Sequence, residues 1–123
     1  ANTSDEYVGV IYLTKTALTG VDFTAKLQYQ NSAGNVVDLP NGTLHFCRAQ
    51  WNNIKLVVDF LTKKYVSVKV CGIDFPTLCK LPLYPTTHTN EPNILAGYIR
   101  NIGDGTNAAT VWVDDFLLTM NEP

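Results

Sequence analysis

The sequence predicts an all-β protein that folds as a single antiparallel sandwich or barrel. Apolar and polar residues alternate with a period of two in segment after segment, and turn residues interrupt these segments roughly every eight to twelve positions. No segment carries a long helical period. Because 123 residues is the length of one ordinary domain, we predict a single β domain over residues 1–123.

The composition excludes several classes of protein. Hydrophobic residues make up 46% of the chain and charged residues 16%, which is typical of a globular domain rather than a disordered one. No apolar run approaches the roughly 20 residues of a membrane-spanning helix, so we expect no membrane insertion. The net charge of −2 provides no basic excess for phosphate backbones, so nucleic acid is not an expected partner.

The clearest predicted strand covers residues 21–30, where Phe23 and Leu27 share one face with Ala25 and Tyr29. The Asn, Ser and Gly residues of segment 31–35 favour a reversal into a second strand at 36–39. An Asn-Gly pair within residues 40–43 is a strong hairpin signal, so a further reversal is expected there.

Two denser strands follow at 54–60 and 65–70, joined by a turn at 61–64. Strict alternation places Tyr65 on the outward face of the second strand. Cys71 and Gly72 then interrupt the pattern, and 73–75 either continues the strand or begins a short partner. We expect Trp51, just before the first of these strands, to cap the core.

The last part of the chain is predicted to contain the longest irregular connection, residues 76–92, because four prolines lie in it. Strands are expected at 93–100 and 108–120, with a turn at 101–107. The predicted core collects the inward apolar residues of all these strands: Phe23, Leu27, Ile54, Leu56, Val58, Phe60, Val66, Val68, Val70, Ile99, Val111 and Val113.

The three cysteines, Cys47, Cys71 and Cys79, allow at most one disulfide within the chain. The pair Cys71 and Cys79 is the most plausible bridge, and free thiols are the favoured alternative. Cys47 and His45 share a strand face, a placement more typical of packing than of a catalytic pair.

The run WNNIKLVVDF at 51–60, followed by KKYVSVKVCGI at 63–73, resembles the central hairpin of concanavalin A-like and laminin G-like jelly rolls. The segment ATVWVDDFLLT at 109–119 is similar to the closing strand of many bacterial jelly-roll modules. The resemblance implies an antiparallel jelly-roll-like β-sandwich from a bacterial surface or carbohydrate-binding-module-like family. It also implies an extracellular or cell-surface location, carbohydrate binding without catalysis, and in some members a structural calcium ion.

Sugar recognition requires aromatic platforms beside planar hydrogen-bonding side chains. Strand alternation places three aromatic residues and an arginine on outward faces, and these are the predicted ligand-binding residues: Tyr65, Tyr98, Arg100 and Trp112. We therefore expect a non-catalytic module that recognises a polysaccharide or glycan. The alternative is a structural or assembly domain whose outward aromatics contact another chain or a second copy.

Asp114 and Asp115 form the one acidic pair inside a predicted strand. Adjacent strand residues point to opposite faces, so the two carboxylates cannot flank a single scissile bond. Either residue could join a structural calcium site or accept hydrogen bonds from loop amides. The Glu-x-Asp-x-x-Glu motif of related glucanases is missing from the sequence, so we expect no enzymatic activity.

Overall fold

The computed structural model describes residues 3–19, 22–47, 50–89, 97, 99–100 and 117–119. The chain divides into two compact units, Ala1–Glu91 and Pro92–Pro123. In the second unit the described residues are exposed and belong to no strand, although they fall within the predicted strands 93–100 and 108–120. The remaining residues of those two strands, Val111 and Val113 included, lie outside the described residues.

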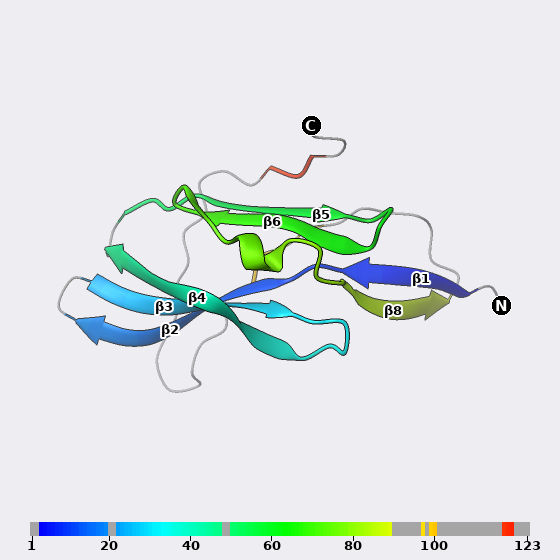
Figure 1. Cartoon of the computed structure of the whole chain (residues 1–123), viewed down its shortest axis with the longest axis horizontal. Helices are drawn as coiled ribbons and strands as arrows, with labels where there is room; N and C mark the ends of the chain where they lie inside the picture. Colours follow the sequence, from blue (N-terminus) through cyan, green and yellow to red (C-terminus); the bar gives the residue numbers. More distant parts are fainter. Residues whose placement is uncertain are drawn as a thin grey trace. The chain divides into compact units, whose positions relative to one another are not determined.

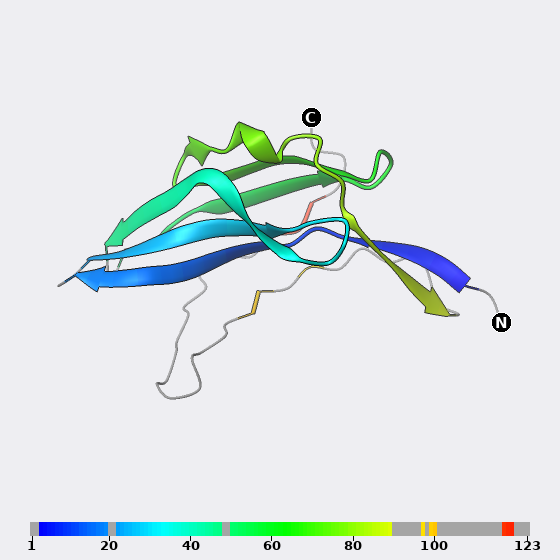
Figure 2. The same ribbon diagram turned by 60° about the horizontal axis from the view of Figure 1, so that its bottom comes forward.

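The first unit is all-β, as predicted, with three antiparallel sheets among its described residues (Figure 1). One sheet contains β2 (Ile11–Thr19), β3 (Asp22–Gln30) and β4 (Val36–Cys47), and a second contains β5 (Ile54–Asp59), β6 (Lys64–Val70) and β7 (Ile73–Asp74). The third is a ribbon of β1 (Thr3–Val8) and β8 (Tyr84–Thr89), which extends beyond the other two sheets (Figure 2).

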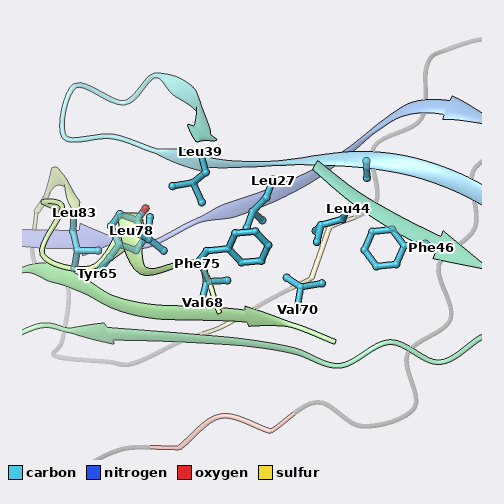
Figure 3. Close-up of a cluster of buried hydrophobic side chains, with 11 residues drawn as sticks. Leu27, Leu39, Leu44, Phe46, Tyr65, Val68, Val70, Phe75, Leu78 and Leu83 are labelled. Carbon is cyan, nitrogen blue, oxygen red and sulfur yellow. The ribbon is translucent and has the colours of Figure 1, made fainter. Parts of the chain in front are cut away.

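The core lies between the two three-stranded sheets (Figure 3). Leu27 of β3 and Val68 and Val70 of β6 are fully buried, as the alternation predicts. Leu56 and Val58 of β5 are partly buried against them. The full set of buried apolar side chains is Ala25, Leu27, Leu39, Leu44, Phe46, Tyr65, Val68, Val70, Phe75, Leu78 and Leu83.

The expectation of a long irregular connection at 76–92 is wrong. Pro76 opens a short 3-10 helix, η1 (Pro76–Leu78), and Leu78 and Leu83 enter the core. The prolines did not prevent pairing either, because Pro85 lies within β8, opposite Tyr7 of β1. Proline is compatible with an edge strand when the position of its missing N–H faces away from the ladder.

A β-bulge in β6 reverses the predicted orientation of two residues. Val57 pairs with Ser67 and Val58 with Tyr65, so Val66 is the additional residue on its strand. An extra residue shifts the alternation by one position. Tyr65 is consequently only 1% exposed and Val66 is 40% exposed, so the predicted outward Tyr65 and inward Val66 are both wrong.

The predicted reversal at 40–43 is also wrong, because β4 continues without a hairpin. Lys26 pairs with Thr43 and Gln28 with Asp38, so residues 39–42 together lie opposite one residue of β3. The φ of +58° at Asn41 creates this irregularity. The Asn-Gly pair therefore bends an edge strand rather than ending it.

Three other predicted turns or interruptions are confirmed, at 31–35, 61–64 and 71–72, and the turn predicted at 101–107 lies outside the described residues. Asn31 Oδ1 accepts hydrogen bonds from the N–H groups of Ala33 and Asn35, and the chain reverses between β3 and β4. The turn at 61–64 joins β5 to β6. Cys71 and Gly72, both at positive φ, connect β6 to the short partner strand β7.

Three further core predictions are wrong. Ile54 pairs with buried Val70 but is 50% exposed, because β5 is the edge strand of its sheet. Phe60 lies beyond the end of β5, in the turn, and is 44% exposed. Ile99 is 55% exposed in the second unit. The side chain of Phe23 lies outside the described residues.

Candidate functional site

Trp51 is the most exposed aromatic side chain in the described part of the chain, at 70% exposure. The expectation that it caps the core is wrong. The core beside the start of β5 is already filled by Val70, the register partner of Ile54, and by Phe46 near the end of β4. Trp51 is therefore left outside, in the segment 50–53 between β4 and β5, which we call the Trp51 loop.

The Trp51 loop is tied to the turn between β6 and β7. The Cys71 N–H donates to the Asn53 carbonyl oxygen at 2.7 Å, and the Cys71 thiol donates to Asn52 Oδ1 at 3.2 Å. Asn52 Nδ2 donates in turn to the Gln50 carbonyl oxygen at 3.2 Å. These bonds connect the residues on both sides of Trp51 to the folded domain, so the indole is presented from an anchored backbone.

The other side chains of the Trp51 loop are neutral and polar. Gln50, Asn52 and Asn53 are all exposed and carry planar amides. Ile54 of β5 and Ile73 of β7 both pair with Val70 of β6, and each is about half exposed. Because the Trp51 loop contains no ionisable side chain, its own residues supply stacking area and hydrogen bonds but no acid or base.

A second polar surface covers the outer face of the β2-β3-β4 sheet. Thr14 Oγ1 donates to Gln28 Oε1 at 2.8 Å, and Gln28 Nε2 donates to Asp38 Oδ1 at 2.6 Å. Lys26 Nζ lies 3.4 Å from the same carboxylate oxygen. The hydrogen bond from Gln28 and the charge of Lys26 hold the pKa of Asp38 below its usual range. These contacts join side chains of this face to one another, as on many solvated antiparallel sheets.

Of the four predicted ligand-binding residues, the structure describes Tyr65 and Arg100. Tyr65 is buried, and its hydroxyl accepts from the Val10 N–H at 3.0 Å and donates to the Gln30 carbonyl oxygen at 2.8 Å. Tyr65 therefore cannot form an outward platform. Arg100 is exposed, whereas Tyr98 and Trp112 lie outside the described residues.

The predicted calcium ligands, Asp114 and Asp115, also lie outside the described residues. Within the described ranges no three His, Cys, Asp or Glu residues lie close enough together to hold a metal ion. Cys71 and Cys79 are free and exposed, so the bridge considered between them is not formed. No described helix has the length and apolar character to cross a membrane.

No protein-family model, curated protein or solved structure matches the sequence. Sequence reasoning missed the Trp51 loop because Trp51 adjoins the most apolar strand, which favours a core role. The one available signal was the run of three amides around it, Gln50, Asn52 and Asn53.

Proposed function

We propose that this protein is a non-catalytic binding module that recognises a polysaccharide or glycan, and that the Trp51 loop is its binding site. The observation that carries the proposal is an indole 70% exposed among three exposed amide side chains. A pyranose ring has an apolar C–H face that stacks on an aromatic ring, while its hydroxyl groups need planar hydrogen-bonding partners. The Trp51 loop offers both kinds of group from one short segment.

The anchoring of the loop supports the same proposal. Association costs less free energy when the binding groups are already ordered. The hydrogen bonds from Cys71 to Asn53 and Asn52 order the loop before any ligand arrives. Ile54 directly follows the Trp51 loop, and Ile73 lies on the other side of Val70 in the strand register. Their apolar surface would extend the platform along the sheet.

The proposed fold and setting follow the sequence resemblance. A jelly-roll-like sandwich of the concanavalin A-like or laminin G-like kind is consistent with two antiparallel sheets that enclose a core. We place the protein outside the cell or on its surface, where polysaccharides are accessible. A structural calcium ion at Asp114 and Asp115 belongs to the same proposal, and its test is the melting temperature of the native protein and of Asp115→Asn in calcium and in chelator.

The alternative function is assembly with another chain or a second copy. The half-exposed Ile54 and Ile73, which both pair with Val70 near the Trp51 loop, favour it, because exposed apolar side chains can also form an interface between chains. The two functions predict different behaviour. A binding module remains at one oligomeric state as its concentration rises, whereas an assembly domain forms larger species.

The test is titration calorimetry with a panel of soluble polysaccharides. We expect heat with at least one of them, and its loss in Trp51→Ala. The matched control is Val36→Ala, which removes an apolar side chain 48% exposed on a different hairpin and should retain binding. Binding that survives Trp51→Ala but disappears in Trp112→Ala would refute the Trp51 loop as the site. A silent panel together with concentration-dependent light scattering would favour assembly.

A further inference from the structure

The turn between β5 and β6 has an apolar apex. Leu61 is 89% exposed, the highest value among the large apolar side chains of the described residues, and Phe60 beside it is 44% exposed. Asp59 Oδ1 accepts hydrogen bonds from the N–H groups of Leu61 at 2.8 Å and Thr62 at 3.3 Å. These bonds fix the backbone of the turn that carries Leu61. Figure 1 shows this turn at one end of the β5–β6 hairpin.

Three exposed lysines flank this apex. Lys63 and Lys64 follow it after Thr62, and Lys63 Nζ lies 4.9 Å from the centroid of the Tyr7 ring. Lys80 joins them because its N–H donates to the Tyr65 carbonyl oxygen at 2.9 Å, which places it beside the start of β6. The acidic residue of this hairpin end is Asp59, whose carboxylate is bound to the turn amides. The apex therefore combines two apolar side chains with an excess of positive charge.

We propose that this apex, Phe60 and Leu61 with Lys63, Lys64 and Lys80, docks on an anionic lipid surface. Exposed apolar side chains at the end of a hairpin can insert into the interfacial region of a bilayer, because the lipids rearrange around them. Anionic headgroups complement the charge of the lysines. The docking is shallow and needs no spanning segment.

The lipid-docking apex is separate from the proposed glycan site. The Trp51 loop precedes β5 and the apex follows it, so the six residues of β5 lie between them. A strand of that length separates the two surfaces by roughly 20 Å. The protein could therefore use both at once, with the apex on a membrane and Trp51 on a glycan.

The test is co-sedimentation of the full chain with vesicles of phosphatidylcholine alone, or with about a third phosphatidylserine. We expect binding to the anionic vesicles and little to the neutral ones, with a decrease at high salt. Phe60→Ser with Leu61→Ser should weaken partitioning by about tenfold or more, since both apolar contacts are lost. Lys64→Ala with Lys80→Ala should weaken it as well. Circular dichroism checks that each variant is folded.

The matched control is Val36→Ser, which removes an apolar side chain that is 48% exposed on another hairpin and should leave vesicle binding unchanged. Equal binding by the native protein and the Phe60, Leu61 double variant would overturn the proposal, because simple charge adsorption needs no apolar apex. Failure to bind anionic vesicles while binding polyglutamate would also overturn it in favour of an acidic protein partner. Neither result affects the glycan site, which Trp51→Ala tests separately.

Discussion

The hydroxyl of Tyr65 joins three parts of the fold. It accepts from the Val10 N–H between β1 and β2 and donates to the Gln30 carbonyl at the end of β3, while the residue itself belongs to β6. Its ring also lies edge-on to Tyr29, with 5.8 Å between the ring centroids. A side chain predicted to face solvent is therefore a structural contact between the two three-stranded sheets.

Tyr65→Phe tests this role. It keeps the ring but leaves the Val10 N–H and the Gln30 carbonyl without their partner, so we expect a loss of about 1 to 3 kcal/mol in the free energy of unfolding. Urea denaturation measures it. The control is Tyr84→Phe, whose ring is only partly buried beside Gly34 and which should change stability little. An equal loss in both variants would mean that the Tyr65 hydroxyl has no special role.

The same residue makes stability depend on alkaline pH. Burial raises the pKa of Tyr65 above its ordinary value of 10.0. A raised pKa in the folded state favours the neutral phenol, so this contribution is complete below pH 10 and is lost as the pH rises through the folded-state pKa. The stability difference between the native protein and Tyr65→Phe should therefore shrink above pH 10 in urea denaturation series. A difference that stays constant with pH would contradict the assignment.

At the scale of strands, the alternation of apolar and polar residues identified β3, β5 and β6, and turn residues identified the reversals between them. The alternation predicted the wrong side-chain orientation or a false turn wherever a strand contains extra residues. The bulge at Val66 and the four residues 39–42 opposite one residue of β3 are set by the register between strands. Register is a relation between distant segments, so the period of one segment cannot reveal it.

Gly42 offers a test of the bend in β4. A Cβ at this position would lie 2.9 Å from the Leu39 carbonyl oxygen and 3.0 Å from that of Leu27. Backbone atoms cannot move aside as flexible side chains do, so Gly42→Ala should destabilise the protein by about 1 to 3 kcal/mol. Thermal or urea denaturation measures the change. Gly72→Asn is the control, because that site is open and Asn tolerates its positive φ. If both variants unfold alike, close packing at Gly42 is not the cause.

At the scale of the whole molecule, the candidate site was harder to predict than the fold. The exposure of Trp51 depends on which side chains fill the adjacent end of the core, and these come from β4 and β6. The position of Trp51 next to an apolar strand in the sequence does not reveal which side chains these are. Sugar binding requires aromatic rings beside planar hydrogen-bonding side chains, and the predicted outward faces offered Tyr65, Tyr98 and Trp112 for that role.

Coupling between binding and unfolding provides a test on the intact protein. Trp51 is mostly exposed, so Trp51→Ala should change the free energy of unfolding by no more than about 0.5 kcal/mol. A bound glycan stabilises the folded state, by about 2.7 kcal/mol when its free concentration is 100 times the dissociation constant. The melting temperature of the native protein should therefore rise with a glycan that binds, while that of Trp51→Ala should not. If the melting temperature instead rises with protein concentration in the absence of glycan, the stabilising partner is a second copy, and the surface around Trp51 is an assembly interface.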